Sequence, residues 1–220
     1  MRWIFGDTET TGLGRDSKAV EIAWVETDDD FNVVAKHHSL LNPMMPIQPD
    51  ATEVHGITNE MVADKPTIDQ YMDFLGHPLQ GDDVVLAAHN ARFDRAYFGP
   101  WMGGVGVLCT LKAARAIYPD APNHKLGTLK SYLSLTEDGK THSASGDVHV
   151  LLQLAKRLCF DADTDLYGLL ALTNKPRVIE KMPFGMHKGK RLIDVPQDYV
   201  HWLLSQANVD ADLRKSLEAL

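Results

Sequence analysis

The sequence predicts an α/β fold: a mixed sheet, part antiparallel meander and part parallel, flanked by helices and followed by a small C-terminal module. Strand-like segments come first along the chain and follow one another through short connections. Short apolar runs then alternate with helical patterns, and this order is typical of a mixed sheet with helices packed on it. The composition changes near residues 173–176, where we expect a domain boundary.

The meander is predicted from three segments, residues 1–7, 19–27 and 31–41. The second is rich in Val, Ile and Trp, which favour strands. The aspartate run at residues 28–30 is interpreted as a solvated turn, because the later Gly and Glu ligands of a calcium loop are missing.

Helices and further strands are predicted in the rest of the chain. Thr58 gives a helix-start signal, and Asn90 is expected to cap a short helix that runs through about Tyr97. Strands are predicted at residues 84–89 and 105–109, and helices at 67–75, 111–117, 126–133, 147–158 and 196–204.

The composition of the 220 residues is that of a globular protein, with 44% hydrophobic and 24% charged residues. It excludes a disordered chain, a fibrous repeat and a disulfide scaffold. Cys109 and Cys159 form no CxxC pair, which favours a reducing compartment. We find no signal peptide and no apolar run long enough to span a membrane, so we expect a cytoplasmic protein without a membrane partner.

The net charge of −8 argues against a protein that coats nucleic acid. The charge is unevenly divided. Residues 1–174 carry 14 basic and 24 acidic groups, a net of −10, whereas residues 175–220 carry 8 and 6, a net of +2. Phosphate contact is therefore expected from the basic C-terminal residues, and a solvated basic face is the alternative. These residues are Lys181, Lys188, Lys190 and Arg191.

Four carboxylates are candidates for metal ligands. Asp7 and Glu9 are two residues apart in a strand, so both side chains lie on one face. Asp94 follows an apolar strand, and Asp147 begins a predicted helix five residues after His142. Each acid alone has an ordinary interpretation, as a solvated strand end or an acid in a helix's first turn. Together, oxygen-only ligands favour Mg²⁺ or Mn²⁺ and a two-ion site for phosphoryl transfer.

Three segments in this order resemble the motifs of the DEDDh family of 3′→5′ exonucleases. They are Asp7-Thr8-Glu9-Thr10-Thr11-Gly12, His89-Asn90-Ala91-Arg92-Phe93-Asp94 and His142-x-Ala144-x-x-Asp147. His55-Gly56-Ile57-Thr58 resembles a further substrate-contacting element. The likeness covers nearly the whole chain and implies a ribonuclease H-like fold. Gly6 departs from the family, which usually has an aliphatic residue before the first Asp.

The resemblance implies an exonuclease catalytic domain at residues 1–170, with the basic, aromatic module at 175–220. Asp7, Glu9, Asp94 and Asp147 would hold two Mg²⁺ or Mn²⁺ ions, and His142 would act as general base on water. The substrate would be a DNA 3′ end, single-stranded or duplex, and the products 5′-mononucleotides, in repair or recombination. Substrate contacts are expected from Thr8, Thr10, Leu13, His55, Ile57, Asn90, Phe93, Lys188, Lys190 and Arg191; for Leu13, an ordinary loop leucine is the alternative.

Other functions stay open at this point. The core motifs also fit a proofreading subunit of a DNA polymerase or an RNA-trimming exonuclease. The tail, with Tyr199, Trp202 and Leu203 to bury, resembles a folded module more than a flexible polymerase-binding tail. A catalytically silent nucleic-acid-binding module is disfavoured because all four acids and the histidine are present. A monomer and a homodimer are both compatible with the sequence.

Overall fold

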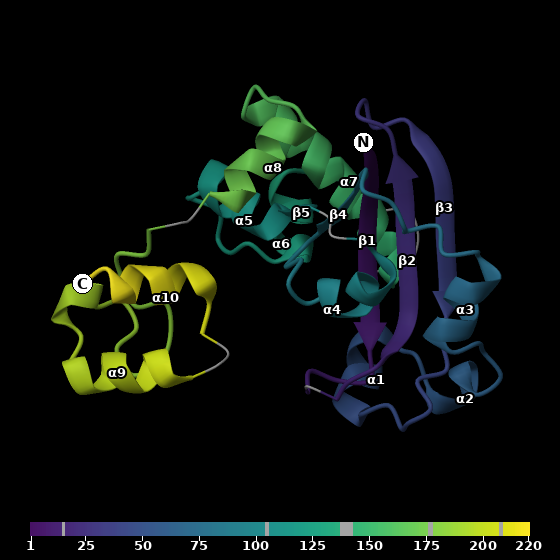
Figure 1. The fold of residues 1–220 in the computed structure, drawn as a ribbon, viewed down its shortest axis with the longest axis horizontal. Coiled ribbons are helices and arrows are strands. Elements are labelled where there is room, and N and C mark those ends of the chain that lie inside the picture. The colour runs from purple at the N-terminus through teal and green to yellow at the C-terminus, as the bar shows by residue number, and fades with distance from the viewer. Residues whose placement is uncertain (15, 104–105, 137–142, 176–177, 207–208) are drawn as a thin grey trace. The chain divides into compact units, whose positions relative to one another are not determined.

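The computed structural model describes residues 1–14, 16–103, 106–136, 143–175, 178–206 and 209–220. The chain divides into two compact units, Met1–Asn174 and Lys175–Leu220 (Figure 1). No helix among the described residues has the length and apolar character needed to cross a bilayer.

The first unit is built on a five-stranded sheet of order β3-β2-β1-β4-β5. The antiparallel meander is formed by β1 (Arg2–Thr10), β2 (Ala19–Thr27) and β3 (Val33–Leu40). The two parallel strands are β4 (Val84–Ala88) and β5 (Gly106–Cys109). The predicted mixed sheet is therefore confirmed, and β1 is its central strand.

Helices cover both faces of this sheet. Trp3 and Phe5 belong to a core shared with the long helix α7 (Ala144–Asp161), whereas Ile4 lies in a second core on the opposite face. The alternation of side chains along a strand separates these two sets. Asp7 and Glu9 continue the odd-numbered positions, so they lie on the face that α7 covers.

The remaining helices of the first unit are short. They are α1 (Pro49–His55), α2 (Asn59–Val62), α3 (Ile68–Phe74), α4 (Arg95–Phe98), the 3-10 turn Gly99–Trp101, α5 (Thr110–Ile117), α6 (Leu126–Tyr132) and α8 (Leu166–Asn174). The sequence predicted α2, α3, α5 and α6 within a few residues. Thr67 caps α3 in a capping box with Gln70, which fixes where that helix begins.

The predicted cap at Asn90 is wrong. Asn90 has a left-handed backbone (φ 67°), residues 89–94 form turns, and α4 begins only at Arg95 with Asp94 at its N-cap position. Asn is one of the few residues that tolerate this conformation, and here it turns the chain directly after β4. The consequence is that Asp94 lies at the start of the helix.

Strand β1 extends three residues beyond the predicted Asp7, to Thr10. It pairs with β4 only from Arg2 to Phe5, whereas its pairing with β2 continues to Thr10. The second half of β1 therefore has a ladder on one edge only. Asp7 and Glu9 project from this half.

The second unit contains the 3-10 turn Leu192–Asp194 and the helices α9 (Gln197–Ser205) and α10 (Ala211–Glu218). A bridge between Lys181 and Arg191 closes its N-terminal loop. Its own small core contains Met182, Leu192, Val195, Val200, Leu203, Val209, Leu213 and Leu217.

Candidate metal centre

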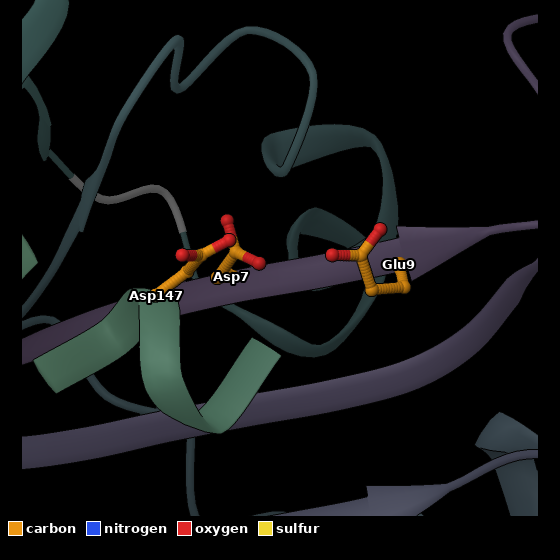
Figure 2. Close-up of side chains that lie close together, drawn as sticks. All are labelled: Asp7, Glu9 and Asp147. Carbon is orange, nitrogen blue, oxygen red and sulfur yellow. The ribbon is translucent and has the colours of Figure 1, made fainter. Parts of the chain in front are cut away.

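Three carboxylates converge beside the central strand. Oxygen atoms of Asp7 and Glu9 on β1 and of Asp147 on α7 all lie within 4.8 Å of one another. Figure 2 shows Asp147 entering from the helix toward the strand that carries the other two. Residues far apart in the sequence thus present one oxygen-only group of possible ligands, which suits a hard divalent cation.

The start of α7 is fixed by a cap that the sequence analysis did not predict. Ser143 occupies the N-cap position, and its hydroxyl accepts a hydrogen bond from the backbone N–H of Gly146. The helix therefore begins at Ala144, three residues before the predicted start. Asp147 lies in the first turn, where the helix dipole favours a negative charge.

The carboxylates repel one another. Burial, followed by the charges of Asp94, Asp147 and Glu9, raises the pKa of Asp7 well above its ordinary value. Burial and then Asp147 raise the pKa of Glu9 to about 8. Such shifts mean that ionising these carboxyl groups costs free energy in the folded chain, and a bound cation would offset this cost. The donor set therefore fits a divalent metal ion.

Asp94 is buried, with 2% of its surface exposed, and lies outside the three-residue group. Its Oδ1 accepts a hydrogen bond of 3.0 Å from the hydroxyl of Thr8. Burial raises its pKa to about 7, although the Thr8 bond opposes this shift. After burial, Asp94 is the largest cause of the raised pKa of Asp7, so the two carboxylates share one electrostatic environment.

Glu21 on β2 is a member of this environment that the sequence analysis missed. It lies opposite Glu9 in the strand register and is only 5% exposed. Its Oε2 accepts a 3.0 Å hydrogen bond from the backbone N–H of Ala144, and its Oε1 lies 2.6 Å from Nε2 of His38. This hydrogen bond raises the pKa of His38. Glu21 thus ties β2 to the first residue of α7; the signal was an acid inside the apolar run Ala-Val-Glu-Ile-Ala-Trp-Val.

Comparison with known proteins identifies the family. The family model described as "Exonuclease" (RNase_T) matches residues 4–155. Exodeoxyribonuclease 10 of Escherichia coli (strain K12) is 32% identical over 219 residues, which cover 96% of this chain and 95% of that protein. The chain belongs to the exonuclease family. The predicted family and enzyme class, a 3′→5′ exonuclease that hydrolyses phosphodiesters, are confirmed.

Solved structures of exonucleases share the fold. A structure described as exonuclease X in complex with 5′ overhanging duplex DNA superposes with a TM-score of 0.63 and 28% identity, over 79% of this chain and 99% of that chain. Exonuclease I of E. coli with a dA16 oligonucleotide matches with a TM-score of 0.62 and 20% identity, over 77% of this chain and 42% of that one. The ribonuclease H-like fold predicted for this exonuclease is confirmed.

Two further matches concern parts of the chain. The epsilon subunit of DNA polymerase III from Pasteurella multocida is 31% identical over 167 residues, 68% of this chain and 65% of that subunit. Residues 175–219 match a second family model, described as "Putative quorum-sensing-regulated virulence factor". This second match begins at the first residue of the second compact unit.

The exonuclease's other predicted contact residues surround the end of β1. His55 is buried; its Nε2 lies 3.2 Å from the carbonyl of Thr10, and its Nδ1 accepts the backbone N–H of Ile57, which is also buried. The hydroxyl of Thr10 donates to the carbonyl of Gly12. The bond between His55 and Thr10 joins α1 to the strand that carries Asp7 and Glu9.

Leu13, Asn90 and Phe93 lie in turns. The side chain of Leu13 is 91% exposed on the loop that follows β1. Asn90 is exposed, and Phe93 is half-buried with its ring centroid 5.5 Å from that of Tyr97. None of the three belongs to the carboxylate group.

The histidine of the third motif, His142, falls outside the described residues. His89, the histidine of the second motif, has hydrogen-bonding partners outside the carboxylate group. Its Nδ1 lies 2.9 Å from the Thr110 hydroxyl, and its Nε2 lies 2.7 Å from the His124 carbonyl. Burial lowers the pKa of His89 to about 4, so it is neutral near pH 7. Its two bonds give it a structural role at the end of β4.

Proposed function

We propose that this exonuclease is a metal-dependent 3′→5′ exodeoxyribonuclease that releases 5′-mononucleotides from DNA 3′ ends. The observation that carries the proposal is the group formed by Asp7, Glu9 and Asp147 in a chain of this family. DNA is the proposed substrate because the full-length relative is named an exodeoxyribonuclease and the neighbouring exonuclease X structure holds DNA.

The proposed ligands are Asp7, Glu9 and Asp147, with Asp94 beside them, and the proposed cofactor is a pair of Mg²⁺ or Mn²⁺ ions. When bound, such ions stabilise negative charge on the attacking and leaving oxygens of the phosphodiester. The chain contributes the placement: β1 fixes two carboxylates on one face, and the Ser143 cap of α7 fixes the third.

His142 is the proposed general base, on the strength of the sequence motif. An imidazole with an ordinary pKa of about 6.5 is neutral at pH 7.5 and accepts a proton from water there. The attack of that water on the terminal phosphodiester leaves the phosphate on the released nucleotide. We therefore expect the hydrolysis rate of the wild type to rise with pH around the ordinary imidazole pKa of about 6.5. The rate of His142→Ala should not show this rise.

The 3′-terminal nucleotide would lie along the half of β1 that has a ladder on one edge only. Backbone groups around Thr8 and Thr10 are the proposed contacts for its 3′ end. Leu13, exposed on the following loop, is the proposed apolar contact for the terminal base, where it would favour unstacking. Asn90 and Phe93 complete the proposed contacts from the turn after β4.

The alternative of a polymerase proofreading subunit has less support. The match to the polymerase epsilon subunit covers 68% of this chain, whereas the match to exodeoxyribonuclease 10 covers 96%. A role in repair or recombination is therefore the proposed one. Stable co-purification of the chain with a DNA polymerase would favour the alternative.

The test uses DNA and RNA oligonucleotides of matched sequence, single-stranded and duplex, labelled at the 5′ or the 3′ end. With Mg²⁺ or Mn²⁺, 3′-labelled DNA should yield labelled mononucleotide first, and 5′-labelled DNA a ladder that shortens. Asp120→Ala, at an exposed turn, is the matched control for Asp7→Ala. Internal cleavage, or activity that survives EDTA, would contradict the proposal. Faster digestion of RNA than of DNA would identify the protein as an exoribonuclease instead.

A further inference from the structure

The second unit carries exposed apolar side chains that its core does not use. Its buried cluster is formed by residues of the N-terminal loop, α9 and α10, and it includes neither Phe184, Met186 nor Trp202. These three are 43%, 81% and 54% exposed. The ring of Trp202 packs on Tyr199 yet stays half exposed, and together with Phe184 and Met186 it leaves apolar surface outside the core, which indicates a contact surface.

A series of rings connects the loop at residues 184–190 to α9. The ring centroids of His187 and Tyr199 are 4.6 Å apart at 80°, and those of Tyr199 and Trp202 are 5.3 Å apart at 42°. Gly185 has a left-handed backbone (φ 70°), and a Cβ there would lie 2.7 Å from the Tyr199 hydroxyl oxygen. Only a glycine lets the loop approach the helix this closely.

The loop is held in one conformation by its own backbone. The N–H of Met182 donates to the carbonyl of Lys190, the N–H of Gly189 to that of Met182 (both 2.8 Å), and the N–H of Lys188 to that of Gly185 (3.1 Å). The side chains of Lys188 and Lys190 are exposed on this ordered turn. Arg191 is engaged differently, because Asp194 accepts two hydrogen bonds from its guanidinium at 2.8 and 3.1 Å.

We propose that this aromatic-basic face, formed by Phe184, Met186, Lys188, Lys190 and Trp202, binds single-stranded DNA. Unpaired bases stack on the exposed rings, and the two lysines contact the backbone phosphates, which is the combination that sequence-tolerant binders of single strands use. The charge supports this occupant: the unit has a net charge of +2 in a chain of −8. Duplex DNA offers no free base faces, so it is not the proposed ligand.

The role of the face rests on the proposed exonuclease function. A strand held here stays near the chain while its 3′ end is digested, so the face would lower the KM for long single strands and leave the chemical step unchanged. The first unit has a net charge of −10 and repels DNA everywhere except at the proposed metal ions. A separate basic contact on the second unit would offset this repulsion.

Binding is measured with the full chain in EDTA, which prevents metal-dependent digestion. A single-stranded 20-mer should quench the fluorescence of Trp202, and Trp202→Ala should lose both this signal and about five-fold or more in affinity. Trp202→Phe keeps a ring and should keep most of the affinity. Lys188→Ala should weaken binding and reduce its salt dependence, whereas Lys215→Ala, an exposed lysine on α10, should change neither.

A second measurement separates this inference from the proposed function. With Mg²⁺, Trp202→Ala should digest a trinucleotide at the wild-type rate while its KM for the 20-mer rises. If the wild type digests nothing but its Trp202 signal still responds to DNA, the exonuclease proposal fails and this one stands. Unchanged affinity in Trp202→Ala, equal affinity for duplex, or loss only of self-association would overturn the inference.

Discussion

The two units of this chain use charged residues in opposite ways. In the first unit, Asp7, Glu9 and Asp147 are brought together under partial burial, and their mutual repulsion raises the pKa values of Asp7 and Glu9. In the second unit, Lys188 and Lys190 stand exposed on an ordered turn. The difference shows how burial changes what a charge contributes to binding. Like charges that are close together and partly buried favour a bound cation, whereas exposed charges contribute weakly to DNA binding and in a salt-dependent manner.

The largest expected effect comes from the enclosed group. Asp7→Ala should lower turnover by about 10³-fold, since metal ions supply several kcal/mol of transition-state stabilisation and each 1.36 kcal/mol is a factor of ten. The same variant should be more stable than the wild type in EDTA at neutral pH, because a repelled carboxylate has been removed. Nuclease assays and thermal unfolding in EDTA check both results. A less stable variant would show that the acids do not strain the fold.

The two units should also differ in what a core defect does. Leu213 is fully buried in the small core of the second unit, so Leu213→Ala should destabilise that unit by about 2–5 kcal/mol. A unit with so small a core is only marginally stable, so a loss of this free energy should unfold it. We expect the variant to digest a trinucleotide normally and to lose affinity for the 20-mer. Loss of trinucleotide digestion would show that the units do not act separately.

A smaller effect should follow from the bond that places α7. Glu21→Leu removes the acceptor of the Ala144 N–H, and we expect kcat to fall by about 10–100-fold, the range typical of outer partners of metal ligands. Glu21→Gln retains an acceptor oxygen and should restore most of the rate. Circular dichroism would establish that both variants fold. Equal rates in the two variants would remove Glu21 from the site.

The smallest expected effect is a change of stability with pH. Glu9 has a pKa of about 8 in the folded chain against an ordinary 4.5, so between these values the folded state binds more protons than the unfolded state. Stability without metal should therefore fall as pH rises through this window. Because a divalent ion replaces the protons, Mn²⁺ at about 100 times its Kd should raise Tm by on the order of 5 °C, more at pH 8 than at pH 6. Asp7→Ala should lose this difference.

The sequence predicted the meander and the acids because both depend on local periodicity. The strand at Ala19–Thr27 was predicted with its observed bounds, and the two-residue spacing of Asp7 and Glu9 predicted that both lie on one face of the strand. Alternation along a strand requires no tertiary information.

What the sequence could not predict depends on distant partners. Ala144, Ser145 and Gly146 resemble a loop, yet α7 begins there: Ser143 caps the helix, and Glu21, a residue of β2, accepts the Ala144 N–H. Glu21 drew no prediction from the sequence, because only the strand register places it opposite Glu9. Helix α8 was missed because its residues are apolar nearly all round, so no helical stripe stands out.

Gly6, where the resemblance to exonucleases predicts an aliphatic residue, has a direct consequence for how relatives can vary. A Cβ at Gly6 would lie 2.7 Å from the Phe98 ring, which fills the space that an aliphatic side chain would otherwise occupy. The side chains at positions 6 and 98 therefore compete for the same space between β1 and α4. Relatives with a branched residue at the position of Gly6 should carry a smaller side chain in place of Phe98, and in this chain Gly6→Val should be tolerated only together with Phe98→Ala.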